Sequence, residues 1–89
     1  MPPTNPGLTT LGRLLRAYRT EARLTQEALG SRTGLARNYI GQVERGEANI
    51  SYVSISQWLA AVRVTWRRLG AELDDDARGE FARGSGAEG

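Results

Sequence analysis

The chain has no cysteine, no histidine and no lysine among its 89 residues. It can therefore form no disulfide, and it lacks the side chains that build Cys/His metal sites and histidine-based catalytic sites. Its longest apolar run, residues 58–62, is far shorter than the roughly 20 residues that span a membrane. Residues 1–7 contain neither the basic nor the apolar segment of a secretion signal. We therefore expect a cytoplasmic protein that is not an enzyme and does not span a membrane.

The charges are unevenly distributed along the chain. Residues 1–70 carry ten arginines against four acidic residues, a formal charge of +6, whereas residues 71–89 carry two arginines against six acidic residues, a charge of −4. A basic body suits a polyanionic partner such as nucleic acid, although charge alone also fits ordinary solvated helix surfaces. A calcium-binding loop starting at Asp74 would need a glutamate at the position of Ser85. We therefore predict no metal ion and no cofactor.

Apolar spacing and capping residues predict an all-α fold of five short helices with no strand. The first helix is expected from Thr9 or Thr10 to about Ala22, and its buried stripe consists of Leu11, Leu15, Tyr18 and Ala22. The other helices are expected over residues 26–33, 36–45, 52–62 and 66–73, with Thr25, Ser51 and Thr65 as the caps of the second, fourth and fifth. Residues 9–73 would then form the folded domain, between a disordered N-terminal arm (1–8) and a disordered acidic tail (74–89).

Two glycines determine how the second and third helices are joined. Gly34 supplies the positive φ that ends the second helix, and Gly30 has no side chain to hold the two helices apart. Two short helices packed across a tight turn form a helix-turn-helix, whose second helix enters the DNA major groove. The pattern therefore predicts a DNA-binding protein.

The amino-acid sequences of four segments resemble those of one protein family. The matching segments are LGRLLRAYR (11–19), LTQEALGSRTGL (24–35), YIGQVERGEANIS (39–51) and WLAAVRVTWRRL (58–69). They resemble the lambda-repressor-like, Cro-type helix-turn-helix regulators, often called the XRE family. The segment RNYIGQVERGEANISYVSI (37–55) is similar to the controller proteins of restriction–modification systems. The resemblance implies a homodimer that binds double-stranded DNA at a pseudo-palindromic operator.

The third helix carries the residues expected to read bases. Ile40 and Val43 face the core in this reading, so the side chains at positions 36, 37, 38, 41, 42 and 45 point away from it. Arginine can donate to guanine O6 and N7, and asparagine or glutamine can pair with adenine N6 and N7. The resemblance places base reading at Arg37, Asn38 and Gln42. The alternative for Arg37 is a phosphate contact only.

Other residues are expected to bind phosphate or to support the third helix. Gln26 opens the second helix, where free N–H groups favour an anion, and the resemblance gives it a phosphate-binding role. Further phosphate-binding candidates are Arg16, Arg32 and Arg45. The resemblance also implies a partly buried ion pair between Arg19 and Glu44, joining the first and third helices.

The last two helices carry more apolar residues than one small domain needs. We interpret Trp58 as core, beside the expected buried face Tyr52, Ile55, Leu59 and Val62. Because small regulators of the family that the chain resembles dimerise through their last helices, the resemblance implies a two-fold dimer interface built from Val62, Val64, Trp66, Leu69 and Leu73. In the alternative, the fifth helix only covers the domain's own core. An antitoxin that binds a toxin protein through its acidic tail is the second candidate function, and RNA polymerase is a further candidate partner.

Overall fold

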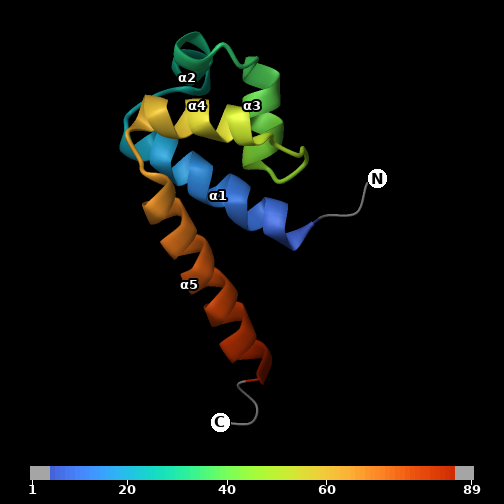
Figure 1. Cartoon of the computed structure of the whole chain (residues 1–89). Coiled ribbons are helices and arrows are strands. Elements are labelled where there is room, and N and C mark those ends of the chain that lie inside the picture. Colours follow the sequence, from blue (N-terminus) through green and yellow to red (C-terminus); the bar gives the residue numbers. More distant parts are fainter. Residues whose placement is uncertain (1–4, 86–89) are drawn as a thin grey trace.

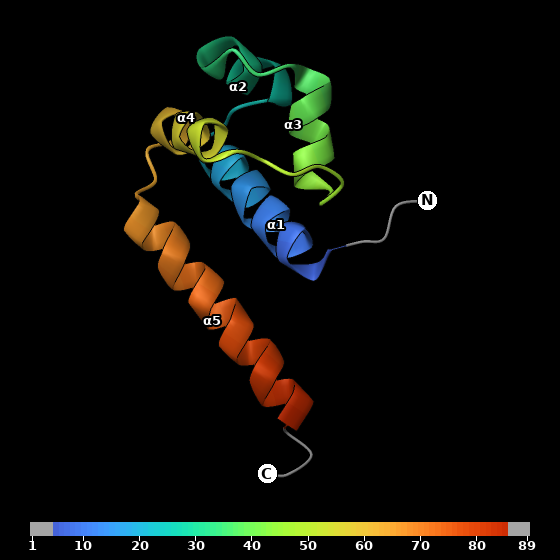
Figure 2. The ribbon, with the colours of Figure 1, turned by 45° about the vertical axis from the view of Figure 1, so that its right-hand side comes forward.

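Five α-helices follow one another along the chain. The structure, a computed structural model, describes the backbone of residues 5–85 and the side chains of residues 5–76. The helices are α1 (Pro6–Glu21), α2 (Gln26–Thr33), α3 (Arg37–Glu44), α4 (Tyr52–Val62) and α5 (Trp66–Ser85). No strand occurs between residues 5 and 85, so the all-α prediction is confirmed. Helices α1 to α4 pack together; α5 packs on α1 with its first half, and its far end extends away from α2 and α3 (Figures 1 and 2).

Side-chain caps and one glycine fix the ends of the predicted helices. Thr25 Oγ1 accepts a hydrogen bond from the Ala28 N–H at 3.0 Å, and Ser51 Oγ accepts one from the Ser54 N–H at 3.1 Å. Gly34 has a φ of 81° and donates its N–H to the Gly30 carbonyl oxygen at 2.8 Å, which ends α2. These caps and the turn glycine are as predicted. Among the described residues, no helix is both long enough and apolar enough to cross a bilayer.

Helix α1 begins earlier than predicted. The Asn5 side chain accepts hydrogen bonds from the N–H groups of Gly7 at 2.8 Å and Leu8 at 3.4 Å, and Pro6 occupies the first helical position. Proline fits there because its missing N–H would have no partner anyway. The predicted start at Thr9 or Thr10 is therefore wrong, because an asparagine–proline cap lies within the segment assigned to the arm. Residues 1–4 lie outside the described residues.

Helix α5 extends past the point where structure was expected to end. We predicted no structure from Asp74 onward, and this is wrong for residues 74–85, which continue the helix. The physical reason is tertiary: the Asp76 carboxylate accepts hydrogen bonds from Arg13 Nη2 at 2.7 Å and Thr10 Oγ1 at 3.2 Å. Composition gives no sign that this acidic segment lies against α1. The rest of the predicted tail, residues 86–89, lies outside the described residues.

The core contains apolar side chains from all five helices and from the loop before α5. It consists of Leu14, Leu15, Tyr18, Leu29, Ile40, Val43, Trp58, Leu59, Val62, Val64 and Leu69. Trp58 is fully buried and donates its indole N–H to the Leu15 carbonyl oxygen at 3.1 Å, as expected for a core residue. Tyr52, expected on the buried face of α4, is instead 71% exposed, because it begins the helix and stacks on Trp66 outside the core.

A polar cluster fixes the first half of α5 on α1. Glu72 Oε1 accepts hydrogen bonds from the Tyr18 hydroxyl and from Arg68 Nε, both at 2.8 Å. The Arg68 guanidinium lies 4.8 Å from the centre of the Tyr18 ring and donates to Glu21 at 3.1 Å. Burial and the hydrogen bond to Glu72 raise the pKa of Tyr18, and the same hydrogen bond lowers the pKa of Glu72. Tyr18 therefore stays a neutral donor to an ionised carboxylate.

Candidate nucleic-acid interface

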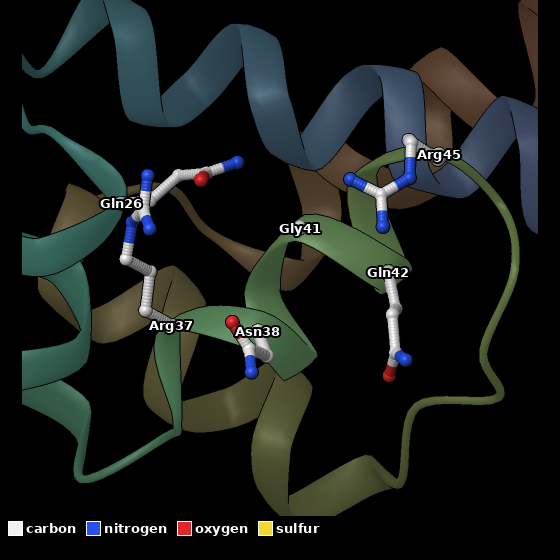
Figure 3. Close-up of a pocket in the computed structure, with 6 residues that line it drawn as sticks. All are labelled: Gln26, Arg37, Asn38, Gly41, Gln42 and Arg45. Carbon is white, nitrogen blue, oxygen red and sulfur yellow. The ribbon is translucent and has the colours of Figure 1, made fainter.

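Helix α3 has a buried side and an exposed polar side. Ile40 and Val43 are buried in the core, whereas Arg37, Asn38 and Gln42 are exposed. Figure 3 shows the latter three on the outer face of the helix. The three predicted base-reading residues therefore share one accessible surface, which a groove of DNA could approach without any change in the core.

This surface contains a hollow of about 270 Å³, which we call the α3 hollow. Its lining residues are Gln26, Arg37, Asn38, Gly41, Gln42 and Arg45. Figure 3 shows Gly41 in the middle, with Gln26 and Arg37 on one side and Arg45 and Gln42 on the other. Two guanidinium groups and three carboxamides around a concavity offer many N–H donors, so the hollow suits a ligand rich in acceptor atoms.

The two arginines of the hollow have only weak partners. Arg37 Nε lies 3.7 Å from Glu27 Oε1, and these side chains are 61% and 78% exposed. Arg45 Nε lies 3.1 Å from Glu47 Oε2, also at the surface. Exposed pairs of this kind contribute at most about 1 kcal/mol. A phosphate or a base edge can therefore replace either carboxylate at little cost.

Beneath this surface, a nearly buried carboxylate joins three helices. Arg19 of α1 donates to both oxygens of Glu44, from Nε at 2.6 Å and from Nη2 at 3.0 Å. Gln26 Nε2 of α2 donates to Glu44 Oε1 at 3.0 Å. The Glu44 side chain is 4% exposed and that of Arg19 is 13% exposed. Arg19 Nη1 also donates a hydrogen bond to the Leu24 carbonyl oxygen at 2.8 Å, so both members of the ion pair have a further hydrogen-bond partner.

Gln26 therefore contacts a protein carboxylate as well as lining the hollow. A carboxamide nitrogen carries two hydrogens, so one remains for a ligand after the bond to Glu44. Arg16 on α1 and Arg32 on α2 are exposed, and neither lines the α3 hollow. The α3 hollow therefore brings together five of the seven residues expected to contact bases or phosphates, namely Gln26, Arg37, Asn38, Gln42 and Arg45.

Sequence reasoning did not assign a role to Gly41 or Tyr39. Gly41 lines the hollow, and its spacing of four residues from both Arg37 and Arg45 is the signal that could have identified it. Tyr39 is half-buried and donates its hydroxyl to the Asn49 carbonyl oxygen at 2.8 Å, which holds the loop after α3 against the helix.

The five residues expected at a dimer interface lie in different environments. Val62, Val64 and Leu69 are buried in the chain's own core, and Leu73 is partly buried against it. Trp66 is 42% exposed, and its ring stacks on Tyr52 with centroids 5.0 Å apart and an interplanar angle of 11°. Among residues 5–76, Val53, which is 62% exposed, is the third large apolar residue at the surface.

Comparison with protein families identifies the fold. A helix-turn-helix domain family matches residues 10–75. The chain belongs to this family. The helix-turn-helix consists of α2 and α3 here, and the resemblance to restriction–modification controller proteins is confirmed by solved structures. No match is found among curated protein sequences.

Several solved structures share this arrangement. The restriction–modification controller protein C.AhdI from Aeromonas hydrophila is 40% identical, over 73% of this chain and 98% of that one, with a TM-score of 0.70. The regulator ClgR from Corynebacterium glutamicum is 20% identical over 97% and 92%, with a TM-score of 0.80. A C.Esp1396I tetramer in complex with its natural 35 base-pair operator is 24% identical over 80% and 93%, with a TM-score of 0.72. The chain is thus a helix-turn-helix DNA-binding regulator similar to controller proteins.

Proposed function

We propose that the protein is a transcriptional regulator that binds a pseudo-palindromic operator as a homodimer and reads each half-site with α3. The observation that carries this proposal is the α3 hollow, where donor side chains meet on the exposed face of the second helix of a helix-turn-helix. A dyad-related pair of such helices meets the same groove about 34 Å apart, one turn of DNA. The likeness to C.AhdI, a controller protein, supports a role beside restriction–modification genes. The protein would act in the cytoplasm, where its operator DNA lies.

In this proposal, Arg37, Asn38 and Gln42 contact base edges, and Gln26, Arg45, Arg16 and Arg32 contact phosphates. The first three are exposed on one face of α3. Gln26 and Arg45 lie at the edges of that face, where the DNA backbone would pass. Arg16 and Arg32, outside the hollow, would contact phosphates further away. The bidentate Arg19–Glu44 pair, which Gln26 joins, fixes the angle of α3 against α1 and α2.

Arg37→Ala is expected to relax sequence preference at one base pair of each half-site. A bidentate arginine–guanine contact discriminates by about 1–3 kcal/mol, so the preferred base there should lose about 5- to 150-fold of its advantage. The measurement is selection of bound duplexes from random DNA with wild type and variant. Arg67→Ala, which removes an exposed arginine of α5, is the charge-matched control. A uniform loss of affinity with unchanged preference would make Arg37 a phosphate contact, and wild-type indifference to sequence would overturn the proposal itself.

Trp66→Ala is expected to weaken the homodimer while leaving the monomer folded. The stacked pair of Tyr52 and Trp66 is exposed at the first residues of α4 and α5, and the neighbouring Val53 is exposed as well. The buried candidates Val62, Val64 and Leu69 belong to the core of one chain. Burying an aromatic pair against its symmetry mate would remove its surface from water. Sedimentation equilibrium should show a dissociation constant at least about tenfold higher for the variant. Trp66→Phe, which keeps the stack, should remain close to wild type; equal dimerisation of Trp66→Ala would contradict this interface.

The antitoxin alternative has no structural observation in its favour. It named the acidic tail as the toxin-binding segment, and residues 74–85 of that tail continue α5, with Asp76 held by α1. Operator DNA and a second copy of the chain are therefore the proposed partners of the regulator.

A further inference from the structure

The middle of the DNA-facing row of α3 has no side chain. Gly41 lies four residues after Arg37 and four before Arg45, so the three share one row along the helix. A glycine inside a helix costs about 1 kcal/mol relative to alanine, and α3 has only eight residues. Gly41 itself is buried beneath the side chains around it, so the helix carries a destabilising residue at the floor of the α3 hollow.

Packing within the chain does not require this glycine. A Cβ atom at position 41 would lie 3.2 Å from Arg45 Nη1 and 3.7 Å from Gln26 Nε2, and both belong to the ends of flexible side chains. By contrast, a Cβ atom at Gly30 would lie 2.8 Å from the Leu35 carbonyl oxygen, which is backbone and cannot move independently. Packing therefore requires glycine at position 30, whereas the space above Gly41 opens into the α3 hollow.

The atoms around that space are hydrogen-bond donors. Arg45 Nη1 and Gln26 Nε2 lie on either side of it, and the guanidinium of Arg37 belongs to the same hollow. Among the four bases, guanine presents two acceptors, O6 and N7, side by side on the major-groove edge. A residue without a side chain is what allows a backbone to come close to a ligand.

We propose that Gly41 is a specificity-determining residue, whose missing side chain lets the edge of a guanine enter the α3 hollow. This inference rests on the proposed DNA-reading role of α3. Gly41 contributes no bond of its own; it sets how closely the helix approaches the bases and so whether the Arg37 guanidinium can reach the guanine edge, while Gln26 and Arg45 stay at the flanking phosphates. The other acceptor that could enter the hollow is a phosphate oxygen, which the experiment distinguishes.

Gly41→Ala provides the test, because its effects on stability and on DNA binding should have opposite signs. The variant should melt at the same or a higher temperature than wild type, since alanine favours the helix. Selection from random duplexes should show that it loses the preference for guanine at one base pair of each half-site. Its affinity for the wild-type operator should fall about tenfold. Gly70→Ala is the matched control: it lies in α5, a Cβ atom there meets nothing within 4 Å, and operator affinity should not change.

A second variant separates Gly41 from Arg45, whose guanidinium a Cβ atom would displace. In an Arg45→Ala background, Gly41→Ala should still remove the guanine preference; if it has no further effect there, Gly41 acts only through Arg45 and the inference is overturned. An equal loss of affinity for all DNA sequences would show that a phosphate, and not a base, occupies the hollow. Unchanged DNA binding would show that nothing enters the hollow. Either result overturns the inference as well. If wild type itself shows no sequence preference, the proposed function fails first, which is distinct from a failure of Gly41 alone.

Discussion

Glu44→Ala is expected to lower the free energy of unfolding by about 3–5 kcal/mol, the range found when one partner of a buried ion pair is removed. The Glu44 side chain is 4% exposed and accepts hydrogen bonds from Arg19 and Gln26. Without it, the Leu24 carbonyl oxygen is the one hydrogen-bond partner that the described residues leave to the Arg19 guanidinium, which is only 13% exposed. In a domain of this size, such a loss lowers the melting temperature by more than about 12 °C. Thermal unfolding followed by circular dichroism measures it.

The control for this prediction is Glu47→Ala. Glu47 also pairs with an arginine, Arg45, but the two side chains are 60% and 53% exposed, so removing the pair should cost less than about 1 kcal/mol. A melting temperature of Glu44→Ala equal to that of Glu47→Ala would show that the Arg19–Glu44 pair does not hold α3 in place. Among molecules that remain folded at low temperature, Glu44→Ala should change operator affinity more than base preference.

Trp58→Ala is expected to destabilise the domain by about 3–5 kcal/mol, the usual cost of truncating a buried aromatic residue. Trp58 is the largest fully buried side chain, and its indole N–H donates to the Leu15 carbonyl oxygen of α1. Its loss leaves a cavity between α1 and α4 and one buried carbonyl oxygen with one hydrogen bond fewer. Because natural domains are stable by only about 5–15 kcal/mol, urea unfolding should show a transition at much lower denaturant concentration.

The second tryptophan supplies the comparison. Trp66 is 42% exposed, so under conditions in which the chain is monomeric Trp66→Ala should cost far less stability than Trp58→Ala. Each variant retains a single tryptophan, so its fluorescence reports one known position. An equal loss of monomer stability in the two variants would contradict the assignment of Trp58 to the core and Trp66 to the surface.

Local sequence signals predicted most of the fold. Thr25, Ser51 and Gly34 act through their own neighbours, so the ends of α2 and the start of α4 could be read from the sequence. The length of α5 could not, because the contacts of Asp76 with Thr10 and Arg13 link residues more than 60 positions apart. The environment of Tyr52 was also missed: apolar spacing gives the face of a helix, but not where the neighbouring helices end.

The candidate site was predictable to a similar degree. Helical periodicity places Arg37, Asn38 and Gln42 on the side of α3 opposite Ile40, and the structure has them exposed there. Periodicity does not show which apolar residues of the last helices turn inward, so Leu69, buried in the core, could not be separated from the exposed Trp66. Periodicity gave no sign of Gly41, because a glycine has no side chain that could bind, and its proposed contribution is the space that it leaves.

The direction of α5 gives the molecule an electrical polarity. In both ribbon views its far end points away from α2 and α3 (Figures 1 and 2), and its exposed Asp74 and Asp75 lie on that departing helix. Near a polyanion, the acidic far end of α5 is repelled, and the resulting torque favours the proposed approach, in which α3 faces the DNA. At physiological ionic strength this torque acts over about 8 Å, which confines the alignment to the final step of the encounter.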